Sequence, residues 1–162
     1  MRILGIDPGY HRCGFAVVTA GKSQPDLLGS GTITTKRTDT LPVRLHALAL
    51  DLDHLLKEWR PDCLAIEELY FAKNVKTGIG VAQARGVVLE HSAAAGLSVA
   101  EYAPSVVKSQ LTGNGQADKQ QVAFMVGRWF KLDDQKRLDD ELDAIAVALC
   151  HAMRAGIPDA MH

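Results

Sequence analysis

The chain has 162 residues, of which 47% are hydrophobic and 23% are charged, and its formal net charge at pH 7 is -1. This length is enough to bury one hydrophobic core, so we expect a single domain over residues 1–162. No apolar stretch approaches the roughly 18 residues that a membrane helix needs, and Asp7 and Pro8 interrupt the N-terminal apolar run where a signal peptide would continue. Three cysteines without a C-x-x-C pair argue against a disulfide framework and against a zinc site. We therefore expect a cytoplasmic protein that does not contact a membrane.

The near-neutral charge does not by itself favour a nucleic-acid-binding protein, because such domains are often basic. Net charge hides the distribution of the charges, however. Acidic residues concentrate between positions 139 and 143, whereas lysines and arginines are scattered along the chain. A basic rim around an acidic site would give the same total.

The first part of the chain predicts three strands joined by short turns. Residues 2–7 are mostly apolar and stop at Pro8-Gly9, which is a turn signal. Residues 13–20 and 27–35 predict two further strands, the second of them rich in β-branched side chains. Connections this short favour an antiparallel meander.

Helices and two more strands follow. Leucines recur at helical spacing over residues 41–59, and the nearly all-apolar segment after them predicts a strand that is buried on both faces and parallel to a neighbour. The remaining elements are a strand, a helix, a strand and three helices, predicted at residues 62–67, 75–96, 97–102, 106–111, 118–130 and 138–155. This element order is typical of the α/β ribonuclease H-like fold. We expect a mixed five-stranded sheet that is flanked by helices and has the first strand in its centre.

Two acidic residues end strands that we expect to be neighbours. Asp7 is the last residue of the first strand, and alternation places it on the same face as Ile3 and Gly5. Glu67 ends the strand at residues 62–67, directly after three apolar residues. If the two strands pair in parallel, these carboxylates lie side by side at the carboxyl edge of the sheet, where open α/β sheets bind ligands.

The last predicted helix supplies two more carboxylates, Asp140 and Asp143, whose i, i+3 spacing puts both on one helical face. Four converging carboxylates without bases would repel one another, and some would take up protons. Divalent cations that prefer oxygen ligands, Mg²⁺ or Mn²⁺, remove this conflict. Two such ions can activate a water and stabilise the leaving oxygen of a phosphodiester. The pattern thus indicates a nuclease in which Asp7, Glu67, Asp140 and Asp143 are catalytic metal ligands.

Each carboxylate also has a purely structural interpretation. Aspartate before Pro-Gly is a common turn residue, and Glu67 could belong to an exposed strand end. Asp140 and Asp143 lie in the first turn of their helix, where acids interact favourably with the helix dipole. The metal hypothesis rests on the joint pattern, because all four positions lead to one edge of one predicted sheet.

Five segments, in order, resemble the signatures of RuvC-type Holliday-junction resolvases. These segments are LGIDPG at 4–9, AIE at 65–67 with FAKN at 71–74, AQARG at 82–86, EYA at 101–103 with the block that extends to residue 119, and DELDAIAVA at 140–148. The resemblance spans nearly the whole chain. It implies an endonuclease that resolves four-way DNA junctions by metal-dependent, symmetric phosphodiester hydrolysis in homologous recombination and DNA repair.

The resemblance also implies cofactors, partners and the roles of individual residues. The four carboxylates match the family's metal-binding catalytic positions, and two Mg²⁺ ions per site are expected, with Mn²⁺ as a substitute. Lys108 and Lys119 match basic residues near the scissile phosphate. Tyr70 is a candidate for stacking on an unpaired base, and Lys73 is a candidate DNA contact. The family works as a homodimer, together with the RuvA–RuvB branch-migration complex.

Three other functions fit part of the pattern. The D-x-G opening also begins actin- and Hsp70-like ATPases, but those need two such lobes and this chain has the length of one. A ribonuclease H-like nuclease that acts on RNA, such as the RuvX group, shares the fold, although the segment at 108–119 and the AQARG helix favour the resolvase. A DNA-structure binding module without catalysis is the non-enzymatic alternative, and the presence of all four carboxylates disfavours it.

Overall fold

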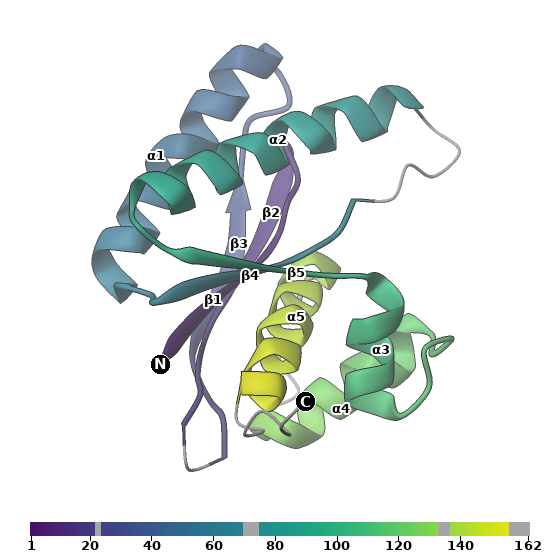
Figure 1. The fold of residues 1–162 in the computed structure, drawn as a ribbon. Coiled ribbons are helices and arrows are strands. Elements are labelled where there is room, and N and C mark those ends of the chain that lie inside the picture. The colour runs from purple at the N-terminus through teal and green to yellow at the C-terminus, as the bar shows by residue number, and fades with distance from the viewer. Residues whose placement is uncertain (22–23, 70–74, 133–136, 156–162) are drawn as a thin grey trace, which may run out of the picture.

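A five-stranded sheet separates two layers of helices in the computed structural model (Figure 1). The structure describes residues 1–21, 24–69, 75–132 and 137–155. The strands are β1 (Arg2–Asp7), β2 (Arg12–Thr19), β3 (Asp26–Thr34), β4 (Cys63–Glu67) and β5 (Ser98–Tyr102). The helices are α1 (Leu41–Trp59), α2 (Val75–Ala94), α3 (Pro104–Thr112), α4 (Lys119–Phe130) and α5 (Asp139–Ala155).

The strand order β3-β2-β1-β4-β5 puts β1 in the centre of the sheet. The first three strands pair antiparallel, as a meander does. In contrast, β4 pairs parallel with β1, and β5 pairs parallel with β4. The mixed sheet with a central first strand that the sequence predicts is confirmed. Element boundaries differ from the predicted ones by at most two residues, and those of β1 and α1 coincide with them.

Alternation along β1 and β4 divides their side chains between the two helical layers. The even-numbered residues of both strands pack with the leucines of α1 and with α2. The odd-numbered residues pack on the opposite face, which α3, α4 and α5 cover (Figure 1). Asp7 and Glu67 continue the odd-numbered series, so both belong to the face that α5 covers.

Two glycines allow α5 to rest directly on the strand backbone. A Cβ atom on Gly5 would lie 2.3 Å from the carbonyl oxygen of Ala144, and a Cβ on Gly14 would lie 1.7 Å from the carbonyl oxygen of Asp140. Carbon and oxygen cannot approach so closely, so a side chain at either position would force the helix away from the sheet. The contact at Gly14 therefore sets where the first turn of α5 lies over β2.

Local chemistry fixes the helix boundaries near the site. α4 begins with a capping box, in which the backbone amide of Gln121 donates to Asp118 Oδ1 at 2.8 Å and the amide of Asp118 donates to Gln121 Oε1 at 2.9 Å. α3 begins at Pro104 and ends before Gly113, which adopts the left-handed conformation with φ 78°. None of the helices in the described ranges is long and apolar enough to cross a membrane.

Replacing Gly14 by alanine should lower the free energy of unfolding by about 1–3 kcal/mol, because the new Cβ would overlap the backbone of α5. Gly127 is the matched control, because no atom lies within 4 Å of where its Cβ would be and alanine favours a helix. Gly127→Ala should leave stability unchanged or raise it by up to about 1 kcal/mol. Urea denaturation of both variants measures the effect, and a Gly14→Ala midpoint equal to the wild-type value would show that α5 does not depend on this contact.

Candidate active site

Asp7 and Glu67 lie beside each other at the carboxyl ends of adjacent parallel strands. The register pairs Ile6 of β1 with Ile66 of β4, so the residues that follow them are neighbours across the sheet. Both carboxylates are partly buried under α5. The sequence predicts this placement from strand alternation and parallel pairing alone.

Asp140 and Asp143 approach the same edge of the sheet from α5. Asp140 belongs to the first turn of the helix, where its negative charge also interacts favourably with the helix dipole. Its backbone lies against Gly14, and Gly14 pairs with Asp7 in the antiparallel register of β1 and β2. Asp140 therefore both stabilises the start of α5 and belongs to the candidate site.

The carboxylates interact strongly through space. Burial, followed by the negative charges of Asp143, Asp140 and Glu67, raises the pKa of Asp7 to about 8. Burial and the charge of Asp143 also raise the pKa of Glu67 to about 7. This edge of the sheet thus concentrates more negative charge than it can stabilise by itself, which is a property of sites that bind cations.

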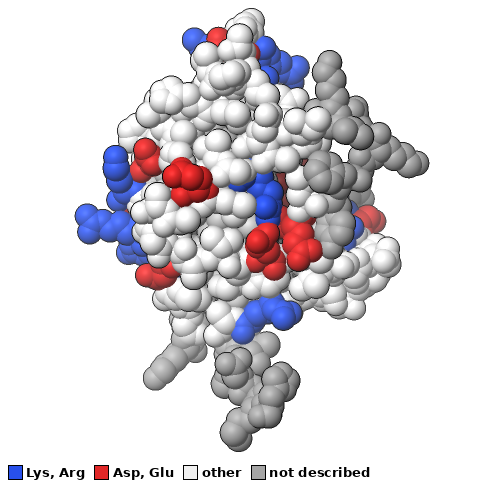
Figure 2. Space-filling view, turned by 45° about the horizontal axis from the view of Figure 1, so that its top comes forward, with Lys and Arg blue, Asp and Glu red and all other residues white. Residues whose placement is uncertain are grey.

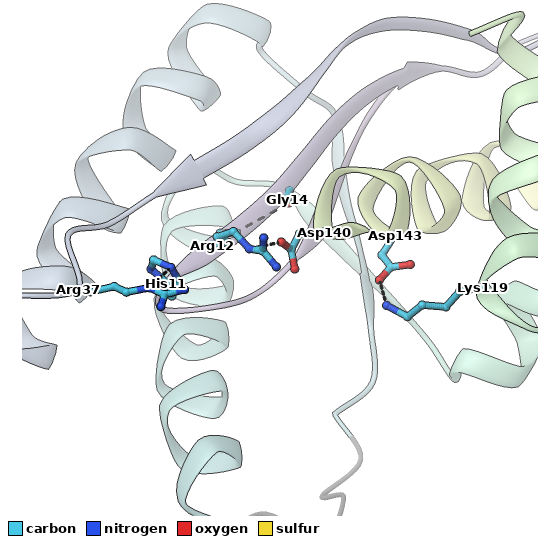
Figure 3. A network of polar contacts seen from close by, with 8 residues as sticks. His11, Arg12, Gly14, Arg37, Lys119, Asp140 and Asp143 are labelled. Atoms are coloured by element: carbon cyan, nitrogen blue, oxygen red, sulfur yellow. Dashed lines mark hydrogen bonds and ion pairs between the residues drawn. The ribbon is translucent and has the colours of Figure 1, made fainter. Parts of the chain in front are cut away.

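Two basic residues neutralise the carboxylates of α5 (Figure 3). Arg12 Nε lies 2.7 Å from Asp140 Oδ2, and Lys119 Nζ donates to Asp143 Oδ2 at 3.1 Å. Within the described ranges, no three side chains of aspartate, glutamate, histidine or cysteine lie close enough together to hold a metal ion. Each carboxylate of α5 instead lies beside its own basic residue. The oxygen donors themselves suit a hard divalent ion.

Lys108 and Lys119 lie on the side of the site formed by α3 and α4. Both line a cavity of about 220 Å³ together with Glu67 and Asp143. Both lysines also lower the pKa of Glu67 against the larger effect of burial. Although burial acts against it, the hydrogen bond to Asp143 and the surrounding carboxylates raise the pKa of Lys119, so this side chain stays charged. In Figure 2, acidic groups near the centre of one face have basic groups directly beside them.

Tyr70 and Lys73 lie outside the described residues. Their predicted contacts with DNA therefore stay predictions that rest on the motif after β4.

Arg12 and Glu141 are neighbours of the site that the sequence motifs do not indicate. Arg12 opens β2, five positions after Asp7, and pairs with Thr34 of β3. It lies two residues before Gly14, the partner of Asp7. Glu141 is 9% exposed and accepts hydrogen bonds at Oε1 from Ser30 Oγ at 2.6 Å and from Arg137 Nη1 at 2.8 Å. It ties the start of α5 to β3 and so helps to orient the helix that carries Asp140.

Comparison with known proteins identifies the family. Residues 3–151 match the family described as "Crossover junction endodeoxyribonuclease RuvC". The chain belongs to the RuvC family. Its relatives include the RuvC of Salinispora arenicola, which is 45% identical over 157 residues covering 96% of this chain and 90% of that protein. The RuvC of Syntrophomonas wolfei is 43% identical over 151 residues, covering 93% of this chain and 88% of that protein.

A solved structure of a RuvC protein has the same fold. "T. thermophilus RuvC in complex with Holliday junction substrate" matches with a TM-score of 0.88 and 33% sequence identity, over 96% of this chain and 95% of that chain. The ribonuclease H-like fold and the junction-resolving endonuclease function predicted from the motifs are thereby confirmed. Membership of the RuvC family also implies a divalent metal cofactor.

In metal-free buffer the protein should become less stable as pH rises from about 4 to 8. The ordinary pKa of an aspartate is 3.8, whereas the pKa of Asp7 in the folded chain is about 8. Between these two pH values the folded state therefore binds a proton more tightly than the unfolded state. Stability from this group is fully present below pH 4 and lost as pH passes about 8. Asp7→Asn should remove much of the fall, as measured by urea midpoints with chelator at pH 5 and pH 8. The exposed Asp51 on α1 provides the control Asp51→Asn, and equal pH dependence in both variants would contradict the assignment.

Proposed function

We propose that this chain acts as a single domain that hydrolyses one phosphodiester in a strand of a four-way DNA junction, with Asp7, Glu67, Asp140 and Asp143 as its catalytic metal ligands. The observation that carries this proposal is that four carboxylates from three separate elements lie at one edge of the sheet, near enough for the other three to raise the pKa of Asp7. A role in a turn, at a strand end or in a helix cap explains the presence of each carboxylate taken singly. These roles do not explain why the four charges lie where their mutual repulsion raises pKa values. Such repulsion lowers the stability of a fold that binds no cation there.

Mg²⁺ is the proposed cofactor, with two ions per site and with Mn²⁺ as a substitute. The donors fit this ion, because four carboxylates offer hard oxygen ligands and neither a thiol nor an imidazole is needed. When bound, the ions supply an activated water and stabilise the leaving 3′ oxygen. Asp7 has to release its proton, and Asp140 and Asp143 have to turn from their basic partners, before all four carboxylates can serve as ligands.

Lys108 and Lys119 are proposed to contact the phosphate that is cut. They line the same cavity as Glu67, and their charges act on that carboxylate. Two ammonium groups at this place can balance the charge that develops on the phosphate during attack. Tyr70 and Lys73 follow β4 directly in sequence, and we propose base stacking for the first and a backbone contact for the second.

The proposed working form is a homodimer whose two sites nick two strands of like polarity. α2 offers a surface for the second copy, since Gly86 is open to solvent and Ile79 is 52% exposed. The family resemblance adds the RuvA–RuvB branch-migration complex as a partner. Three free, buried cysteines suit the reducing conditions of the cytoplasm, which we propose as the location.

A synthetic four-way junction tests the function. With Mg²⁺ or Mn²⁺ the wild-type protein should make paired symmetric nicks, and with chelator it should make none. Loss of an outer-shell partner typically costs ten- to a hundredfold at a metal site, so Asp7→Asn should lower cleavage by at least about a hundredfold while junction binding persists. The control Asp51→Asn should cleave normally. Intact junctions together with cleavage of structured RNA or an RNA–DNA hybrid would contradict the proposal, and so would binding without any cleavage.

Lys108→Gln should lower the single-turnover cleavage rate about a hundredfold, because a charge that stabilises the transition state is lost. Junction affinity should change much less, since one lysine among many phosphate contacts contributes little to binding. Lys57 is exposed on α1, and Lys57→Gln is the matched control. A Lys108→Gln variant that cuts at the wild-type rate would remove this lysine from the mechanism.

A further inference from the structure

Arg12 is the one strongly basic group that contacts a carboxylate of the site from the β2 side among the described residues. Its Nε lies 2.7 Å from Asp140 Oδ2, and the side chains are 43% and 22% exposed. The outer part of the arginine is therefore in solvent while its contact with Asp140 is partly covered. The proposed mechanism uses Lys119 on the opposite side and leaves Arg12 without a role.

Arg12 and Asp140 lie close together as an ion pair, but their geometry is not that of a hydrogen bond. Asp140 Oδ2 is buried and accepts no hydrogen bond from any described residue, even though the guanidinium lies beside it. The pair is thus held by charge rather than by an aligned N–H donor. This oxygen thus has a charged neighbour but no aligned donor, and an oxygen of this kind is also a ligand for divalent cations.

Arg12 and a divalent cation would compete for the same oxygen. The pairing of Arg12 with Asp140 resembles that of Lys119 with Asp143 at 3.1 Å, so each of these carboxylates has a basic partner. Because an arginine is always charged in proteins, Arg12 cannot give up Asp140 by losing a proton. It can do so only if another anion takes the guanidinium.

The surface next to Arg12 is suited to such an anion. His11 precedes Arg12 in the chain, and Arg37 Nε donates to His11 Nε2 at 2.7 Å (Figure 3). Arg37 is exposed, and His11 Nδ1 is buried without a hydrogen-bond partner among the described residues. A phosphate near the start of β2 would therefore find exposed arginine side chains at Arg12 and Arg37. The guanidinium group of an arginine is well suited to phosphate oxygens.

We propose that Arg12 is a positioning residue that exchanges Asp140 for a phosphate of the DNA backbone. Without DNA, Arg12 neutralises Asp140 and opposes the binding of a divalent cation. When the backbone phosphate takes the guanidinium, Asp140 is released to the cation, so metal and DNA bind cooperatively. The inference rests on the proposed function, because it assumes that the carboxylates hold the metal.

If Arg12 exchanges Asp140 for a phosphate, the variant Arg12→Gln should bind the metal more tightly and the DNA more weakly. In DNA-free protein, Arg12→Gln should tighten Mn²⁺ binding about three- to tenfold, because both the competing partner and a like charge are removed. In chelator, the same variant should bind a four-way junction more weakly, with the slope of log affinity against log salt reduced by about one. Calorimetric titration with Mn²⁺ and a fluorescence binding assay over a range of salt measure the two effects.

Two further variants separate this mechanism from general effects of charge. Arg12→Lys keeps the charge and should stay near the wild-type protein in both assays. Arg2 lies at the opposite end of the sheet, at the start of β1, and Arg2→Gln removes the same charge there. It should change neither assay, and urea midpoints confirm that each variant is folded.

Several results would overturn the proposed exchange of Asp140 for a phosphate. If Arg12→Gln weakens both Mn²⁺ and DNA binding, or changes neither, the exchange is wrong. Equal effects of Arg12→Gln and Arg2→Gln would likewise overturn it, because net charge alone would then explain them. Wild-type protein that binds no Mn²⁺ would overturn the proposed metal site and this inference with it, whereas normal Mn²⁺ binding that is insensitive to Arg12 would overturn the inference alone.

Discussion

The contact between α5 and the bare backbone of Gly5 and Gly14 is the constraint on which the site depends. A helix that packs on side chains would stand farther from the sheet, and Asp140 and Asp143 would not reach the ends of β1 and β4. Because Gly14 also pairs with Asp7, one close approach places residues from three elements together. Packing and chemistry are therefore coupled here, and a change in the core that moved α5 by an ångström would also displace two carboxylates.

This arrangement gathers negative charge at a cost to stability. Burial and mutual repulsion raise the pKa values of Asp7 and Glu67, and the neighbouring bases offset only part of this effect. Arg12 and Lys119 each stabilise one carboxylate of α5, but an exposed or half-exposed ion pair contributes little, roughly 0–1 kcal/mol. The free protein is thus not at its most stable arrangement at this edge, as is common where a site is built for a bound cation.

Much of this organisation could be predicted from the sequence, because it follows from local rules. Alternation in β1 and β4 gives the face of Asp7 and Glu67, and helical spacing gives the shared face of the two aspartates on α5. The partners of the helix carboxylates could not be predicted. Arg12 pairs with Asp140, and Ser30 anchors Glu141, only because of how α5 is rotated and shifted on the sheet. The glycine contacts fix that position, and they are visible only in the folded structure.

The near-neutral total charge of the chain is compatible with binding a polyanion because electrostatic effects are local. Charges separated by more than about 8–10 Å are largely screened at physiological ionic strength. A phosphate near the site is therefore influenced by Arg12, Lys108 and Lys119, and by the carboxylates between them, far more than by acids elsewhere on the surface. The lysines approach from the side of α3 and α4, and the arginine approaches from β2. A DNA strand laid across the site would thus meet positive charge on both sides. The carboxylates in the centre repel its phosphates until cations neutralise them, and this makes the binding of DNA and the binding of metal mutually dependent.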